Sequence, residues 1–121
     1  MASSSALDTG KWRIARSFPR FATDLVTRVH SSLTPSEREP MLGRMVDIGL
    51  GGACVIVAEG KLEMRQKVVL EFRFPISLQP LKVKASVRHC RNENRYGFQF
   101  LDLQPEEREK IRKACATLKI V

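Results

Sequence analysis

The sequence predicts a mainly β domain, a small six-stranded antiparallel barrel with one C-terminal α-helix. Apolar and polar residues alternate with period two through the middle of the chain, which is typical of half-buried antiparallel strands. Turns that contain glycine or proline separate these segments. The last segment has its apolar residues at helical spacing instead. Several short strands followed by one helix favour a barrel against which the helix packs.

The length and composition fit one globular domain. A chain of 121 residues with 43% hydrophobic and 28% charged residues has the size and composition of a single domain. No apolar run approaches the length needed to span a bilayer, and residues 1–10 lack the basic and apolar regions of a secretory signal. We therefore expect a flexible N-terminus at residues 1–10, a domain at residues 11–121, a cytoplasmic location and no membrane insertion.

The first strand is predicted at about residues 21–29. Phe21, Leu25 and Val29 lie on one face of this segment because they are separated by even numbers of residues. The polar stretch that follows, residues 31–40, is typical of a loop.

The next two strands are predicted at residues 44–48 and 53–57, because both runs are apolar or β-branched. Three glycines lie between them. This arrangement places Asp47 at or near the end of a strand, where functional groups commonly lie.

A β-hairpin is predicted at residues 67–74 and 81–88, with a turn at residues 75–80 that begins and ends with proline. Apolar residues alternate with polar ones in both strands, and the polar face of the second strand is largely basic. The apolar faces should point into the barrel.

The final strand is predicted at residues 95–100, where three aromatic residues alternate with other residues. Alternating aromatics can bind RNA bases on an exposed sheet, but they more often form barrel core, which is our prediction here. A helix follows Gln104-Pro105, with Glu106 and Glu107 in its first turn. Its apolar stripe, at positions i, i+3, i+4 and i+7, consists of Ile111, Ala114, Cys115 and Leu118.

Neither the cysteines nor the histidines form a recognisable metal or catalytic motif. Cys54, Cys90 and Cys115 are far apart and odd in number, so we expect buried reduced thiols instead of disulfides or a zinc site. His30 and His89 have no partner at metal-ligand or general-base spacing. The sequence predicts no metal, no catalytic residue and no enzymatic activity.

The charge of the chain favours anionic partners. With 21 Lys and Arg against 13 Asp and Glu, the net charge is +8. Nucleic acid, an anionic membrane surface and a phosphate-bearing small ligand all fit this charge, which does not choose among them.

Two short motifs together have the chemistry of a nucleotide site. Arg16 and Arg20 offer planar guanidinium groups that hold phosphate oxygens or stack on a purine. Asp47 can accept hydrogen bonds from the N1–H and amino groups of guanine. Gly49 and Gly52 allow the backbone to approach a ligand closely.

These two motifs resemble the signature of the PilZ family, RxxxR followed by [D/N]xSxxG. The first half matches in full, and the second half differs only in having Gly49 at the position of the serine. The resemblance continues through the strand at residues 67–74, the segment 95–100 and the closing helix, and so covers about residues 12–119.

The resemblance implies a receptor for the bacterial second messenger cyclic di-GMP, with no other cofactor. The implied ligand-binding residues are Arg13, Arg16, Arg20, Asp47, Gly49 and Gly52. In the family the serine hydroxyl helps to hold guanine, and losing one neutral hydrogen bond costs about 0.5–1.5 kcal/mol. Each charge-assisted contact from an arginine contributes about 1.5–3 kcal/mol, so we expect weakened but retained binding. Binding would order residues 11–20 and present a new surface to an unidentified protein partner.

Two other functions fit the same sequence. A PilZ-like domain that has lost its ligand could act as a protein adaptor, as some family members involved in type IV pilus assembly are thought to do, and Gly49 favours this alternative. A basic barrel that binds nucleic acid nonspecifically is a third possibility, which predicts affinity that falls steeply with salt. We expect no specific nucleic-acid partner.

Overall fold

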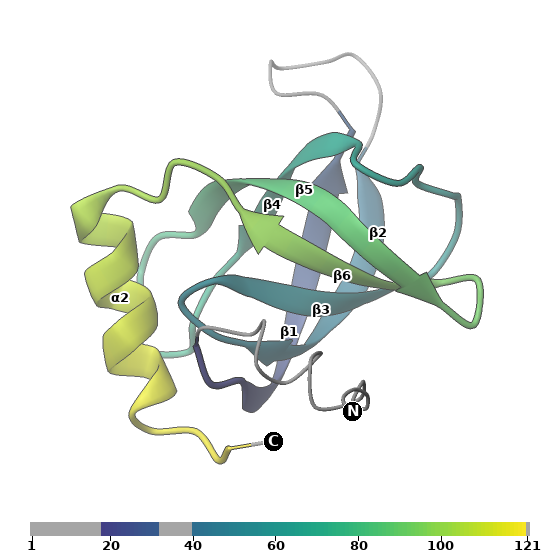
Figure 1. The fold of residues 1–121 in the computed structure, drawn as a ribbon. Coiled ribbons are helices and arrows are strands. Elements are labelled where there is room, and N and C mark those ends of the chain that lie inside the picture. Colours follow the sequence, from purple (N-terminus) through teal and green to yellow (C-terminus); the bar gives the residue numbers. More distant parts are fainter. Residues whose placement is uncertain (1–17, 32–39, 121) are drawn as a thin grey trace, which may run out of the picture.

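The structure, a computed structural model, describes residues 18–31 and 40–120 and confirms the predicted barrel (Figure 1). All neighbouring strands are antiparallel, and they close in the order β1-β2-β3-β6-β5-β4. The strands are β1 (Phe21–His30), β2 (Met41–Ile48), β3 (Gly52–Val57), β4 (Lys67–Phe72), β5 (Leu81–Arg91) and β6 (Arg95–Phe100), and the helix is α2 (Pro105–Cys115).

The barrel interior contains the apolar face of every strand. The predicted alternation is confirmed in the β4–β5 hairpin, where Val68 and Leu70 are buried and face Ala85 and Val83 on the neighbouring strand. The aromatic residues of β6 are also buried, so they form core and no exposed base-stacking platform. The hydroxyl of Tyr96 accepts a hydrogen bond of 3.0 Å from the backbone N–H of Leu62, which satisfies both buried groups.

A β-bulge changes the facing of residues at the end of β2. Met45 lies opposite Val55 on β3, but Asp47 lies opposite Cys54, so Val46 is an extra residue in β2. Strict alternation from the buried Met45 would point Asp47 into the core. The bulge points Asp47 outward instead and returns the next residue of β2 to the core.

A second bulge has the same effect in β5. Val87 lies opposite Phe98 on β6, but His89 lies opposite Gly97, so Arg88 is the extra residue. Without this bulge His89 would continue the buried face that ends at Val87. With the bulge, the end of β5 turns its basic side chains to the outer surface.

Helix α2 lies against one end of the barrel, away from the turn of the β5–β6 hairpin (Figure 1). It begins at Pro105, where the side chain of Glu107 accepts a hydrogen bond of 2.9 Å from the N–H of Gln104. The thiol of Cys115 lies 3.9 Å from the carbonyl oxygen of Ile48, so the helix supports the strand end that carries Asp47. Leu118, predicted on the helix stripe, lies after the helix but still packs on the core.

Burial of the cysteines agrees with the prediction in two cases out of three. Cys54 and Cys115 are buried free thiols, but Cys90 is exposed, because it lies where β5 extends past the barrel towards the hairpin turn. In the described residues there is also no helix with the length and apolar character required to cross a membrane.

Replacing Ile111 by alanine should destabilise the fold strongly. Its side chain is fully buried between α2 and the barrel, and removing such a side chain costs about 2–5 kcal/mol. The matched control is Ile76→Ala, because Ile76 is 83% exposed and the same change there should shift the free energy of unfolding by about 0.5 kcal/mol or less. Urea unfolding monitored by circular dichroism measures both, and equal effects of the two substitutions would contradict this packing.

Candidate functional site

An ion pair joins the two predicted motifs. The Nη1 atom of Arg20 donates to Oδ1 of Asp47 at 2.8 Å. The two side chains are only 14% and 17% exposed, so the pair is screened from solvent more than an ordinary surface pair. Arg13 and Arg16, the other predicted cations, lie outside the described residues. The second arginine of RxxxR and the aspartate of the second motif therefore meet in the folded chain.

The glycine at the serine position is in close contact with the chain that carries Arg20. A Cβ atom on Gly49 would overlap the carbonyl oxygen of Pro19 and approach Cδ of Arg20 to 3.2 Å. The place of a serine side chain is thus taken by the Phe18–Arg20 segment and is not left empty for water. This differs from our expectation that Gly49 simply removes one hydrogen-bonding group.

The other two glycines of the motif complete this contact. A Cβ atom on Gly51 would lie 3.0 Å from the ring of Phe18, and one on Gly52 would lie 3.3 Å from Nη2 of Arg20. A Cβ on Gly52 would also overlap the carbonyl oxygen of Phe98 on β6. We call residues 49–52 the glycine cradle, because the segment 18–20 lies directly on their backbone.

Beside the cradle is a polar hollow of about 70 Å³ on the outer face of the barrel. It is lined by Arg20, Asp47, Cys54, His89, Arg91 and Arg95. Four positions form one row across neighbouring strands, because Asp47 pairs with Cys54, Cys54 with Gly97, and Gly97 with His89. The site therefore spans β2, β3, β6 and β5.

Gly97 makes the floor of this hollow flat. A Cβ atom there would overlap the imidazole ring of His89, so the ring lies directly over the backbone of β6. The absence of a side chain at Gly97 thus lets β5 place an aromatic ring next to the thiol of Cys54.

The pKa of the Cys54 thiol is affected by its burial and by three nearby charged groups. Burial raises the pKa of this thiol, and the guanidinium of Arg95 acts in the opposite direction as a nearby donor. Smaller effects on the same pKa come from the carboxylate of Asp47 and the guanidinium of Arg20. All three charged groups line the same hollow as this thiol.

Sequence reasoning found the residues on the Arg20 side of the site but missed those on the other side. His89 and Arg91 escaped notice because the alternation in β5 is interrupted by its bulge. Arg95 looked like an ordinary solvated strand residue. The only available signal was Gly97, a glycine between two aromatic residues. Among the residues that the structure describes, no cluster of three or more His, Cys, Asp or Glu side chains could hold a metal.

Comparisons with known proteins agree on the type of domain. The sequence matches the family model of the PilZ domain over residues 15–117. The fold is similar to the PilZ domain with c-di-GMP of YcgR from Escherichia coli, with a TM-score of 0.67, 14% identity, and coverage of 86% of this chain and 91% of that one. A search of curated proteins gave no significant match.

Two further solved structures have the same fold. The inhibitor of motility MotI/DgrA of Bacillus subtilis aligns with a TM-score of 0.65 and 19% identity over 84% of this chain and 49% of that one, so this chain spans about half of it. The PilZ domain of CeSA from a cellulose-synthesizing bacterium aligns with a TM-score of 0.61 and 16% identity over 80% of this chain and 94% of that one.

A side chain at Gly49 should displace the Phe18–Arg20 segment. Gly49→Ala forces a methyl group against backbone, and overpacking of this kind costs about 1–3 kcal/mol. Gly51→Ala is the control, because there the new methyl group meets only the movable ring of Phe18. Denaturant unfolding and the amide NMR shifts of Arg20 and Asp47 measure the effect. If Gly49→Ala is as mild as Gly51→Ala, the cradle contact is wrong.

The three thiols should differ in reactivity towards a disulfide reagent such as dithionitrobenzoate. Cys90 is exposed and should react first. Burial raises the pKa of both Cys54 and Cys115, so less thiolate is present at pH 8 than for an ordinary cysteine, and their rates should rise only at higher pH. In a Cys90→Ser variant, the remaining thiols should react slowly in the native protein and quickly in urea. Fast native reaction of that variant would contradict the burial of both thiols.

Proposed function

We propose that this chain, which belongs to the PilZ domain family, is a receptor module that binds cyclic di-GMP and passes the signal to a protein partner. The observation that carries the proposal is the meeting of Arg20 and Asp47 over the glycine cradle. Support also comes from the similar YcgR domain, whose structure contains c-di-GMP. The members of this family are binding modules, and the match covers residues 15–117.

Asp47 keeps hydrogen-bonding capacity for a guanine. Arg20 bonds to its Oδ1 atom, and a carboxylate has about four acceptor sites on two oxygens. The remaining acceptor sites on Oδ1 and Oδ2 can therefore accept from the N1–H and the amino group of a guanine. The ion pair with Arg20 holds the carboxylate in place before the ligand arrives, which reduces the entropic cost of binding.

Arg20 likewise keeps donors for a phosphate. A guanidinium has five N–H donors, and the contact with Asp47 uses one nitrogen. The Nη2 atom lies over Gly52, at the edge of the hollow. Arg13 and Arg16 precede this position in the sequence, and we propose that they add two further cations to the ligand.

A cyclic dinucleotide is larger than a hollow of 70 Å³ and would lie across the outer face of the strands, with only part of it in the hollow. We propose that residues 11–20 close over it and, together with the barrel surface, form the face that a partner protein recognises. Phe18, Pro19 and Arg20 already rest on the glycine cradle, so the ordering would affect the residues before them.

A second candidate function is that of an adaptor that binds no nucleotide. The close contact of Pro19 with Gly49 and the neutralisation of Arg20 by Asp47 favour it, because both fill positions that a ligand would use. Such an adaptor would use the apolar groove of about 540 Å³ between β1, residues 74–76 and the end of α2, beside the exposed Ile76.

Isothermal titration with cyclic di-GMP distinguishes these functions. We expect saturable binding to the wild type, no binding of GTP, and a loss of about 10- to 100-fold in affinity for Arg16→Ala and Arg20→Ala, since each removes a charge-assisted contact. Arg44→Ala is the matched control. Arg44 on β2 donates to Asp24 on β1, and it does not line the hollow.

Two other results would change the assignment. No heat signal with the wild type at high micromolar ligand would favour the nucleotide-free adaptor. Equal losses for the Arg44 and Arg20 variants would mean that only net charge matters, as expected for nonspecific binding of polyanions.

A further inference from the structure

We propose that Arg91 and Arg95, at the end of the β5–β6 hairpin, form a phosphate-binding pair opposite Arg20. This inference rests on the proposed function, because the phosphate it assigns belongs to the same ligand. Neither residue lies in the RxxxR or [D/N]xSxxG motif. Three features of the site support this pair: the charge balance of the hollow, the register of the hairpin and the direction in which both residues face.

The charge balance places the excess positive charge on the β5–β6 side. Three guanidinium groups and one carboxylate line the hollow among the described residues. Arg20 and Asp47 neutralise each other at 2.8 Å, which leaves Arg91 and Arg95. Within the described part of the chain, no carboxylate lies within ion-pair distance of either residue. An anion that enters the hollow is therefore attracted to this pair.

The cross-strand register of the hairpin places two like charges opposite each other, which lowers the stability of the sheet unless an anion lies between them. Arg91 and Arg95 are direct cross-strand partners in β5 and β6. Like charges that lie opposite each other on one face of a sheet destabilise it. A local arrangement that opposes stability in this way is typical of a functional site.

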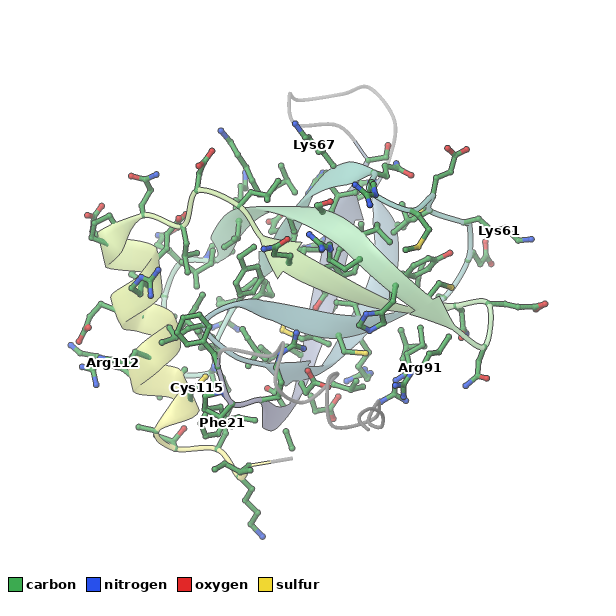
Figure 2. The ribbon with its side chains drawn as sticks, in the orientation of Figure 1. Phe21, Lys61, Lys67, Arg91, Arg112 and Cys115 are labelled. Atoms are coloured by element: carbon green, nitrogen blue, oxygen red, sulfur yellow. The ribbon has the colours of Figure 1, made fainter. Side chains whose placement is uncertain are left out.

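The bulge in β5 brings Arg91 to the same face of the sheet as Arg95. The extra residue Arg88 turns His89 and Arg91 to the outer face, which is the face of Arg95 and Gly97. Arg95 also approaches the thiol of Cys54, deep in the site. Figure 2 shows Arg91 beside the β5–β6 hairpin, far from Arg112 on α2.

The chemical class of the ligand follows from two separate groups of cations. Arg20 lies on one side of the hollow and Arg91 with Arg95 on the other, with the floor of Cys54 and His89 between them. Two guanidinium groups that lie close together can each donate parallel hydrogen bonds to the oxygens of one phosphate. A ligand with two phosphates, such as a cyclic dinucleotide, can contact both groups, whereas a mononucleotide monophosphate can contact only one.

Titration of cyclic di-GMP into Arg91→Ala and Arg95→Ala tests the assignment. We expect affinity to fall by about 10- to 100-fold in each, with a smaller fall for Arg91→Lys, which keeps the charge but not the fork. Arg88→Ala is the matched control, because Arg88 lies on the same strand and bonds to Gln99 away from the hollow. Its affinity should stay within about twofold of the wild type.

Thermal unfolding separates a ligand contact from a structural role. Removing one of two opposed like charges should leave the unfolding midpoint of Arg91→Ala unchanged or raise it. Wild-type affinity in both alanine variants would overturn the proposal, and so would an affinity loss that comes with a clearly lower unfolding midpoint.

A second probe makes the result independent of the proposed function. In ¹⁵N-labelled wild-type protein, titration with pyrophosphate should shift the side-chain Nε–Hε signals of Arg91 and Arg95 more than that of Arg88. If cyclic di-GMP does not bind but these signals shift, the proposed function is wrong and the anion site remains. If cyclic di-GMP binds and the two signals stay still with both ligands, the site is wrong and the receptor function remains.

Discussion

Two of the β-bulges in the barrel, at Val46 in β2 and at Arg88 in β5, bring Asp47, His89 and Arg91 to its outer surface. A closed barrel with an apolar interior cannot accept charged groups on its inner face without a large desolvation cost. Each bulge reverses the facing of the residues after it, so Asp47 and Arg91 point outward although the pattern before them points inward. The polar hollow depends on both reversals, because its floor crosses the strands between the two bulges.

The other side of the site depends on close contact between two backbone segments. The Phe18–Arg20 segment rests on the glycine cradle, and Arg20 reaches Asp47 only because Gly49 and Gly52 leave room for it. The resulting ion pair is preorganised but also neutral, so a ligand must share both partners. Arg91 and Arg95 have no ion-pair partner among the described residues, and they provide the attraction that this neutral pair lacks.

Period-two patterns were sufficient to predict the fold, since burial of one strand face is a local property of the sequence. The hairpin of β4 and β5 and the aromatic core of β6 were predicted in this way, and the closing helix was predicted from its apolar stripe at helical spacing. Bulges have no such local pattern, which is why His89 and Arg91 were missed. Cys90 was wrongly expected to be buried, because the sequence does not show that this end of β5 extends past the barrel. The contact between Gly49 and Pro19 joins residues 30 positions apart in sequence, and spacing alone did not reveal it.

The most direct measurement is a map of amide chemical shifts in ¹⁵N-labelled protein during titration with cyclic di-GMP. We predict the largest changes at Arg20, at Asp47 and the glycine cradle, and at the β5–β6 hairpin end, with little change along α2. Changes concentrated at the apolar groove beside Thr117 and Leu118, or no changes at all, would contradict a ligand site built on the two bulges and the cradle.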